Sequence, residues 1–398
     1  MRIGIVGNPG RFHNSFSMST KALWKANDNT GNLAFRYAVA NHIASEKVFL
    51  SLNADPDFVR ETCDLLVFPS ANGINPKTEK IHPRRADFIE AVDLPCVVVG
   101  LGAQAPSLDH ELQLSDGTQR WLHAIADRSN LIGVRGEYTA DVLARIGIKN
   151  TTVLGCPSLL TNPNPTLGKT IEQKLRKGNP KNLVVTAGMP RKMNLRQVER
   201  QLFSYLRQYE GTYIVQAPEY LVSFAREGEA VISEDNLETL YRYLQPRTAR
   251  YFQSRTKFLT FARRHFRVFF DASAWIEFLS SFDMAIGTRM HGNMLSVQAG
   301  IPGICIYHDS RTQELCRVTA IPHISKQAFL GANRLQEVIK KTSFDGKAFD
   351  ENRTRIARSY KALLTKSGIE VNEELDSLTI ESATQSKTLN EQPLNSIP

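Results

Sequence analysis

One stretch of this sequence decides the fold class: SFDMAIGTRMHGNMLSVQAGIPGICIYHDSRTQELCR, residues 281–317. A short apolar run over 283–286 predicts a buried strand. A helical pattern follows from about 290 to 299, and Gly300 can take the left-handed conformation that ends a helix. A second apolar run, 303–307, predicts another buried strand. A strand, a helix and a strand in this order are typical of a parallel sheet covered by helices.

The same alternation extends over most of the chain. Further strands are predicted at 2–6, 64–68, 95–101, 130–134, 182–188 and 212–217, and helices at 33–44, 137–146 and 352–366. Residues 161–181 are rich in Pro, Asn, Gly and Lys, which is typical of an exposed crossover between domains. We therefore expect an α/β protein of two Rossmann-like lobes facing a cleft, with an N-terminal lobe at 1–165 and a C-terminal lobe at 180–368. Residues 369–398 are acidic and poor in apolar side chains, so a disordered tail is expected there.

Composition narrows the class of protein and of partner. The formal net charge of +9 favours anionic partners, and 42% hydrophobic residues suit a globular protein. Five scattered cysteines without metal-ligand spacing predict neither disulfides nor a zinc site, so no metal and no tightly bound cofactor are expected. The first residues lack the pattern of a signal peptide, which favours a cytoplasmic protein. No nucleic-acid motif is present, so nucleic acid is not an expected partner.

The start of the helix predicted at 290–299 is the strongest candidate site. Gly287, Thr288, Arg289, Met290 and His291 lie where unpaired backbone N–H groups and the helix dipole favour an anion. An arginine adds a bidentate grip on phosphate or carboxylate, and a histidine titrates near neutral pH. The alternative interpretation is an ordinary helix start with a solvated charge.

The amino-acid sequence of this segment resembles that of a known family. The run GTRMHGNMLSVQAGIPGICIYHDSRTQEL resembles the signature of the polysaccharide pyruvyl transferases, and NTGNLAFRYAV, DLLVFPSANGIN, LPCVVVGLGAQAP and VRGEYTADVLARIGIKNTTVLGCPS resemble other segments of the same family. The resemblance covers roughly residues 1–325. It implies a GT-B-like build of two Rossmann-like lobes. It also implies a transferase that moves pyruvyl from phosphoenolpyruvate onto two hydroxyls of a glycan sugar, forming a ketal and releasing phosphate.

The resemblance also implies roles for individual residues. Arg289 would hold the phosphate or carboxylate of the donor, the backbone of residues 287–290 would assist, and His291 would act as general acid or base. Because the donor is highly charged, further cations are needed. Candidates at strand ends are Arg191, Lys192, Arg135 and His308, although a solvated loop, an ion pair or a turn explains each of them as well.

The acceptor side is less clearly marked. Asn32 and Gln104 are candidate contacts of the acceptor, with turn chemistry as the alternative. Arg311 and Glu314 carry less weight, because an Arg-x-x-Glu spacing commonly forms a pair within one helix. Residues 247–270 interleave basic and aromatic side chains. They predict either an amphipathic helix with its aromatic side chains in the core or contact with the inner face of a membrane, where the glycan acceptor would be lipid-linked.

One rival function shares the same architecture. A GT-B glycosyltransferase that uses a nucleotide sugar would also place an arginine and a helix N-terminus at the donor's diphosphate, so the fold does not separate the two activities. The segments GTRMHG and GLGAQAP resemble those of the pyruvyl transferases, which favours pyruvyl transfer.

Overall fold

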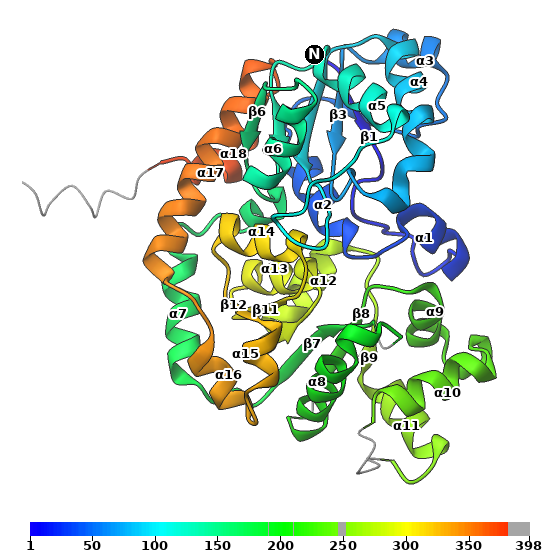
Figure 1. The fold of residues 1–398 in the computed structure, drawn as a ribbon, viewed down its shortest axis with the longest axis vertical. Coiled ribbons are helices and arrows are strands. Elements are labelled where there is room, and N and C mark those ends of the chain that lie inside the picture. Colours follow the sequence, from blue (N-terminus) through cyan, green and yellow to red (C-terminus); the bar gives the residue numbers. More distant parts are fainter. Residues whose placement is uncertain (190, 210, 246–251, 381–398) are drawn as a thin grey trace, which may run out of the picture.

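Two lobes, each built on one six-stranded sheet, make up the protein (Figure 1). The computed structural model describes residues 1–189, 191–209, 211–245 and 252–380. All strands within each sheet run parallel. Fully buried parallel strands need apolar side chains on both faces, which the Val-, Ile- and Leu-rich runs of this sequence supply. The expected α/β fold with two lobes is confirmed.

The sheet of the first lobe has the strand order β2-β1-β3-β4-β5-β6. Its strands are β1 (Ile3–Val6), β2 (Lys47–Leu50), β3 (Leu65–Pro69), β4 (Cys96–Leu101), β5 (Ile132–Val134) and β6 (Thr151–Val153). Its helices are α1 (Thr20–Asn27), α2 (Asn32–His42), α3 (Pro56–Thr62), α4 (His82–Val92), α5 (Asp116–Ala126) and α6 (Glu137–Arg145), with the 3₁₀ helices η1 (Pro76–Ile81) and η2 (Pro157–Leu160). The direction of crossover reverses between β1 and β3, which marks the switch point where ligands bind in such sheets.

The sheet of the second lobe has the order β12-β11-β10-β7-β8-β9. Its strands are β7 (Leu183–Ala187), β8 (Thr212–Val215), β9 (Phe266–Arg267), β10 (Met284–Gly287), β11 (Gly303–Tyr307) and β12 (His323–Ser325). Counted within the lobe, this is the doubly wound order 3-2-1-4-5-6, with its switch point between β7 and β10. The strand–helix–strand unit predicted from residues 283–307 is confirmed, and Gly300 has a left-handed φ of 77°.

Helices cover both faces of the second sheet. They are α8 (Arg196–Gln208), α9 (Glu219–Glu227), α10 (Glu234–Tyr243), α11 (Arg255–His265), α12 (Ala272–Ser280), α13 (Met290–Gln298), α14 (Ser310–Thr319), α15 (Lys326–Leu330) and α16 (Leu335–Lys341), with the 3₁₀ helices η3 (Met193–Leu195) and η4 (Glu229–Val231). Helix α13 is buried along its whole length between the two lobes, which explains its lack of a polar face.

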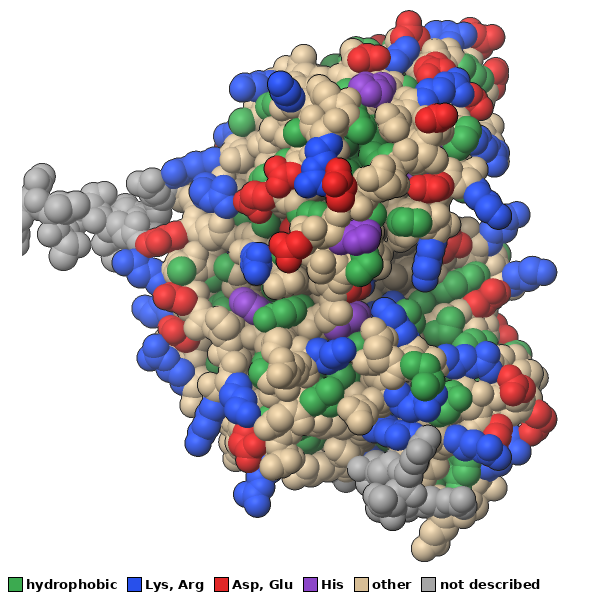
Figure 2. All heavy atoms as spheres, viewed as in Figure 1, with side chains coloured by type: hydrophobic (Ala, Val, Ile, Leu, Met, Phe, Trp, Pro, Cys, Tyr) green, Lys and Arg blue, Asp and Glu red, His purple; other side chains and the backbone are tan. Residues whose placement is uncertain are grey.

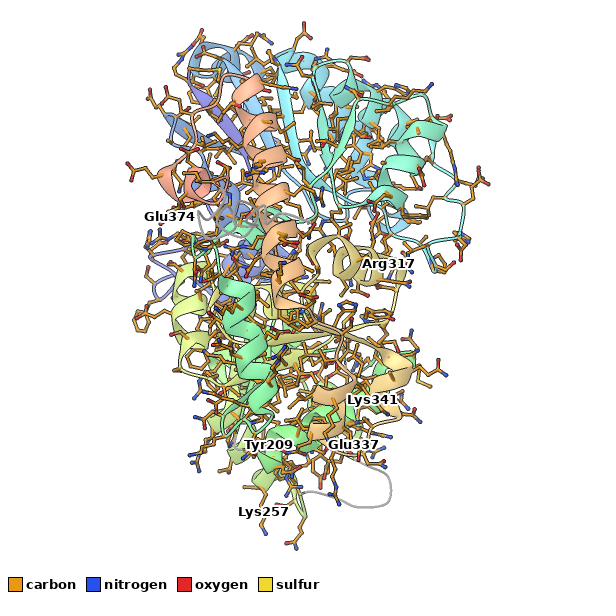
Figure 3. All side chains as sticks on the ribbon, turned by 90° about the vertical axis from the view of Figure 1, so that its left-hand side faces the viewer. Tyr209, Lys257, Arg317, Glu337, Lys341 and Glu374 are labelled. Carbon is orange, nitrogen blue, oxygen red and sulfur yellow. The ribbon has the colours of Figure 1, made fainter. Side chains whose placement is uncertain are left out.

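The crossover between the lobes is more ordered than the sequence suggested. Residues 161–181 were expected to be an exposed linker, but α7 (Leu167–Lys177) occupies most of them. Leu167, Ile171 and Leu175 recur every four residues and are buried. Their stripe packs against α17 (Gly346–Lys366), a helix that runs from the second lobe to the first with α7 beside it (Figure 3). The helical period was hidden by the flanking Pro, Asn and Gly residues.

The start of the expected tail is also different. Residues 369–380 fold onto the first lobe, with α18 (Glu373–Ser377) capped by Asn372 and with Leu375 and Leu378 buried. An antiparallel bridge joins Val371 to Ile43 at the end of α2. These few apolar side chains are sufficient because they join an existing core instead of forming one. Residues 381–398 lie outside the described residues.

The basic aromatic stretch contributes to the core where it is described. Phe252, Phe258, Phe266 and Phe270 are buried, which agrees with the amphipathic interpretation of residues 252–270. Basic side chains of the same segment stay at the surface, where Arg255 approaches Glu234. Figure 2 shows lysine and arginine side chains interspersed with acidic and hydrophobic ones over this lower part of the molecule. Residues 247–251 lie outside the described residues, and contact with a membrane stays a prediction.

No helix in the described part of the chain has the length and apolar character required to cross a bilayer.

Candidate active site

A cavity of about 1030 Å³ lies between the two lobes. Its walls include segments at the ends of β1, β2, β3, β4 and β5 in the first sheet and of β8, β10 and β11 in the second. The carboxyl ends of both sheets therefore face one space, the place where open α/β sheets bind ligands. Among the described residues, the second-lobe wall consists of Gln216, Arg289, Met290, His291, Arg311 and Leu315.

The turn between β10 and α13 forms the centre of that wall. Glycine is needed at position 287 because a Cβ there would lie 1.9 Å from the carbonyl oxygen of Thr186 on the neighbouring strand. The Asn293 side chain fixes the turn by donating to the carbonyls of Gly287 (2.9 Å) and Arg289 (3.1 Å). Arg289 is the N-cap residue, and no side chain caps α13. The N-terminus of this helix is therefore available to an anion.

Arg289 lines the cavity and is held by backbone carbonyls. Its Nη2 donates to the carbonyls of Gly188 and Ala217, both at 3.2 Å. Its Nε is buried and has no hydrogen-bond partner. Burial lowers the pKa of Arg289 to about 10, opposed by the nearby Glu199 carboxylate. The side chain thus keeps its charge at neutral pH and retains a donor for a bound anion.

His291 lies one residue into α13 and is 9% exposed. Its Nε2 is 3.7 Å from Cys156 Sγ, and its ring lies 5.5 Å from that of Phe35 on α2. Burial, followed by the positive charges of Arg135 and Arg311, holds the pKa of His291 well below the ordinary 6.5. The imidazole of the unliganded protein is therefore neutral at neutral pH, and can accept a proton.

Arg135 reaches the same cavity from the end of β5. It is 2% exposed, with Nε donating to Gly100 O (2.9 Å) and Nη1 to Asn72 Oδ1 (3.1 Å). Its Nη2 is buried without a partner. Burial lowers the pKa of Arg135, with Cys156 acting in the opposite direction. No ion pair of Arg135 is found among the described residues, so its charge remains for a ligand.

Arg311, at the start of α14, completes a group of three arginines. Its Nη2 is 3.4 Å from Asp309 Oδ2, and its Nε is buried without a partner. Each of Arg135, Arg289 and Arg311 thus lines the cavity with one buried N–H nitrogen unpaired. A buried donor left unpaired is costly, so three of them around one cavity indicate an anion site. The sequence interpretation had given Arg311 little weight.

Except for Met290, the other predicted donor contacts lie outside the lining, and these include Gly287. Arg191 is exposed, with Nη2 2.7 Å from Asp235 Oδ2. Lys192 is half-buried, and burial lowers its pKa. The His308 side chain is buried beside Asp309, and burial lowers its pKa as well. Thr288 is buried with an unpartnered Oγ1 but does not line the cavity. Met290 does line it.

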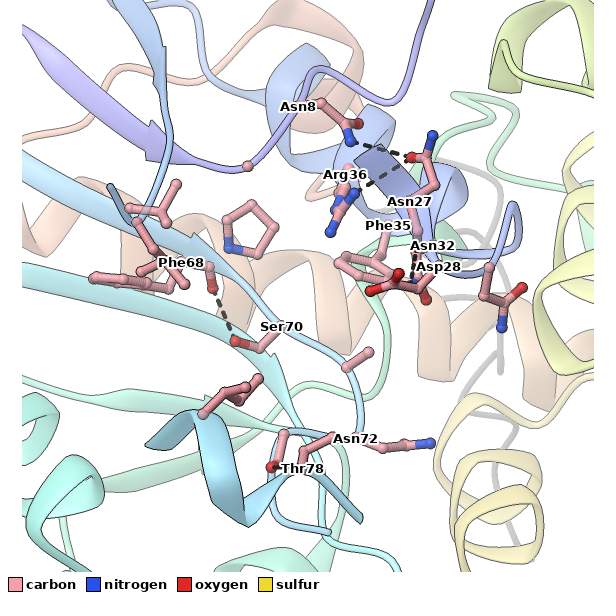
Figure 4. A pocket seen from close by; sticks show the side chains of 18 of the residues that line it. Asn8, Asn27, Asp28, Asn32, Phe35, Arg36, Phe68, Ser70, Asn72 and Thr78 are labelled. Carbon is pink, nitrogen blue, oxygen red and sulfur yellow. Dashed lines mark hydrogen bonds between the residues drawn. The ribbon is translucent and has the colours of Figure 1, made fainter. Parts of the chain in front are cut away.

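Both predicted acceptor residues lie in the first-lobe wall. Asn32 donates through Nδ2 to Asn27 O (3.1 Å), and Gln104 Oε1 accepts from Asn75 (3.1 Å). Figure 4 shows Asn32 near Asp28 and Phe35 on one side of the pocket and Asn72 on the opposite side. Whether these amides contact an acceptor stays a prediction.

Several lining residues were not predicted from the sequence. Gln216 follows β8, is 1% exposed and has a buried Nε2 without a partner. Its position at a strand end was an available signal. Arg36 and Arg85 lie on α2 and α4, where they look like ordinary helix charges, so no local pattern marks them. Trp121, on α5, also lines the cavity.

Direct hydrogen bonds join the lobes around the cavity. Ser310 Oγ donates to Ala105 O (2.6 Å) and accepts from Ala105 N (3.0 Å). The buried Glu314 carboxylate accepts from Thr139 N at 3.1 Å. These bonds tie α14 of the second lobe to the first lobe, and so fix Arg311 relative to Arg135.

No three His, Cys, Asp or Glu side chains gather as a metal site anywhere in the described part of the chain.

The chain matches one protein family and is similar to several solved structures. A family model described as polysaccharide pyruvyl transferase matches residues 29–310. No curated protein sequence matches the chain significantly. Similar solved structures include MnaA of S. aureus with UDP, at 10% identity and a TM-score of 0.42, covering 92% of this chain and 98% of that one. Anabaena HepE with UDP has 11% identity and a TM-score of 0.41, covering 91% and 100%. The UDP-N-acetylglucosamine 2-epimerase of Rickettsia bellii has 9% identity and a TM-score of 0.43, covering 92% and 96%.

Proposed function

The chain belongs to the polysaccharide pyruvyl transferase family, and we propose that it transfers pyruvyl from phosphoenolpyruvate to two hydroxyls of a glycan sugar as a ketal. The observation that carries this proposal is the group of three cavity arginines with unpaired buried N–H nitrogens. Phosphoenolpyruvate carries a phosphate and a carboxylate within a few ångströms. Arg135, Arg289 and Arg311 match up to three negative charges on so small a donor.

The reaction balances without a further reactant. The methylene carbon of the donor gains a proton and becomes a methyl group, and the neighbouring carbon forms two C–O bonds to the sugar. The C–O bond to phosphate breaks. Of the two protons lost by the hydroxyls, one equals the proton gained by the methyl group and the other leaves with inorganic phosphate.

His291 is the proposed base for a sugar hydroxyl. Its lowered pKa keeps the imidazole neutral, so that Nε2 or Nδ1 can take a proton. The same proton can then pass to the methylene carbon or to the departing phosphate. The cluster of arginines stabilises the negative charge of phosphate as it leaves. Positioning of both substrates between two lobes supplies the rest of the rate enhancement.

Release of phosphate from phosphoenolpyruvate with a panel of β-galactosyl and N-acetylmannosaminyl acceptors tests the proposal. Acceptor-dependent release is expected from the wild type and is expected to fall on the order of 10²- to 10³-fold or more in His291→Gln. His123→Gln is a matched control, because His123 is exposed on α5 and does not line the cavity. Its activity should equal that of the wild type.

A different set of results would contradict the proposal. If no acceptor promotes release, and a nucleotide sugar raises the Tm while phosphoenolpyruvate does not, the activity is glycosyl transfer and the proposal is wrong.

A further inference from the structure

The first-lobe wall of the cavity carries more positive charge than a neutral sugar requires. Among the described residues, the whole lining contains seven Lys or Arg side chains and a single acid, Asp28. Three of the seven form the arginine group of the donor site. The other four, Lys25, Arg36, Arg84 and Arg85, belong to the first lobe.

Arg36 projects from α2 into the centre of the pocket (Figure 4). Its Nη1 donates to neutral oxygens, Ala26 O (3.2 Å) and Asn27 Oδ1 (3.4 Å). No carboxylate forms an ion pair with it among the described residues. Burial lowers the pKa of Arg36, while Asp28 acts in the opposite direction. Arg36 is thus a half-buried cation held in place by neutral groups.

Arg85 reaches the same wall from α4. Its guanidinium lies over the ring of Trp121, 5.1 Å from the ring centroid, and His82 stacks on the same ring with the two centroids 4.5 Å apart. Burial and the charge of Arg36 both lower the pKa of Arg85. The described residues provide no ion pair for Arg85 either. An aromatic face orients a guanidinium without neutralising it, so the charge remains available.

Arg36 and Arg85 form no ion pair within the described residues, and Asp28 is the single acid in the described lining. The two half-buried cations repel each other, which is a cost that a bound anion would remove. Phosphoenolpyruvate does not supply that anion, because its charges are already matched by the arginines near His291. We propose that the acceptor glycan carries a phosphoryl group, bound by Arg36 and Arg85, on the first-lobe side of the cavity. This inference rests on the proposed function. A phosphoryl group is favoured over a uronate because two guanidinium groups match two negative charges.

The rest of the wall suits such an acceptor. Asparagine side chains line the same cavity and offer both donors and acceptors to hydroxyls. They are Asn8, Asn27, Asn29, Asn32, Asn53, Asn72 and Asn75. A cavity of about 1030 Å³ lies at the upper end of the range for small-molecule sites, so that a donor and a phosphorylated sugar fit together.

A kinetic test compares acceptors that share one sugar. The set is a methyl glycoside, the corresponding uronoside and the corresponding sugar 1-phosphate, in the galactose and N-acetylmannosamine series. We expect kcat/KM for phosphoenolpyruvate-dependent phosphate release to be at least about tenfold higher with the sugar phosphate than with the methyl glycoside. In Arg36→Gln and Arg85→Gln, the KM of the sugar phosphate should rise about tenfold while the KM of phosphoenolpyruvate stays within about twofold.

Arg145→Gln is the matched control. Arg145 lies on α6 of the same lobe, is exposed, does not line the cavity, and has its Nη1 3.7 Å from Glu111. This variant also loses one positive charge, so a general effect of net charge would change it equally. We expect it to keep the preference for the sugar phosphate.

A binding test separates this inference from the donor assignment. The protein saturated with phosphoenolpyruvate is titrated with pyrophosphate in a calorimeter. One further anion should bind to the wild type and to Arg145→Gln, and at least about tenfold more weakly to the double variant Arg36→Gln/Arg85→Gln. Should phosphoenolpyruvate itself fail to bind, the donor assignment fails. A pyrophosphate site that requires Arg36 and Arg85 would nevertheless support the anion subsite.

Three results would overturn the inference. They are equal kcat/KM for phosphorylated and neutral acceptors, a preference for the uronoside, and pyrophosphate binding that the double variant leaves unchanged.

Discussion

Helices α13 and α14 follow adjacent parallel strands, yet they begin in opposite ways. Asp309 caps α14 through Thr312 N (2.9 Å) and Thr312 Oγ1 (2.7 Å) in a complete capping box. Helix α13 begins with Arg289 and has no side-chain cap. In α14 a side chain accepts from the backbone N–H groups of the first turn. In α13 no side chain does so, and the first turn lies beside three arginines that each have an unpaired buried N–H nitrogen. The uncapped start of α13 lies beside these arginine donors, which supports the proposed anion site there.

The largest expected effect is at the uncapped start. Arg289→Ala should lower kcat/KM for phosphoenolpyruvate on the order of 10³-fold, because the variant loses a charged donor to the reacting anion. The Tm should fall by only a few °C, because Arg289 makes no ion pair within the described residues and loses only its hydrogen bonds to the carbonyls of Gly188 and Ala217. Steady-state kinetics and thermal unfolding of the same preparation check both. A large loss of stability would mean that Arg289 supports the fold more than the ligand.

A second prediction concerns pH. The pKa of His291 lies below 6.5, so its neutral form persists at pH 6.5 and the activity that depends on it is lost only as the pH falls further. Arg311→Gln removes one cause of this shift, so the pKa of His291 should rise and the acidic limb of kcat/KM should begin at higher pH than in the wild type. The activity should also fall about 10- to 100-fold. An unchanged limb would show that His291 is not the titrating group.

The smallest effect is expected at the capped start. Thr312→Val keeps the shape of the side chain but removes the hydroxyl of the capping box, so the free energy of unfolding should fall by about 1 kcal/mol. For a chain of this length, that corresponds to a fall in Tm of about 1–2 °C. The kcat/KM should stay within about twofold of the wild type. A fall in kcat/KM of much more than twofold would show that the start of α14 also contributes to activity, so the two helices would not differ in this way.

The sequence predicted this part of the fold well because its signals are local. The run from 283 to 307 contains the strand, the helix stop at Gly300 and the next strand within 25 consecutive residues, and the structure confirms all three. Arg289 and His291 were found in the same way, since they stand next to the turn that exposes them. The glycine turn between the strand and the helix therefore predicted two residues that line the cavity.

The remaining features depend on contacts distant in the sequence. Arg36 and Arg85 are brought to one wall by the packing of α2 and α4 on the first sheet, and nothing near either residue distinguishes it from a solvated helix charge. The order of residues 369–380 arises because Leu375 and Leu378 join a core made about 300 residues earlier. Arg311 was given little weight because the spacing to Glu314 suggested a pair within α14. Glu314 instead accepts from Thr139 in the other lobe.

The return of the chain to its first lobe has a consequence for how the protein is made. Helix α17 and residues 369–380 complete the surface of the first lobe, where Val371 bridges to Ile43 and Glu370 N donates to Ser45 Oγ. During synthesis the ribosome delivers these segments only after the whole second lobe has emerged. The first lobe must wait with this part of its core open, so the two lobes mature together and a chain cut near residue 165 lacks part of its own interior.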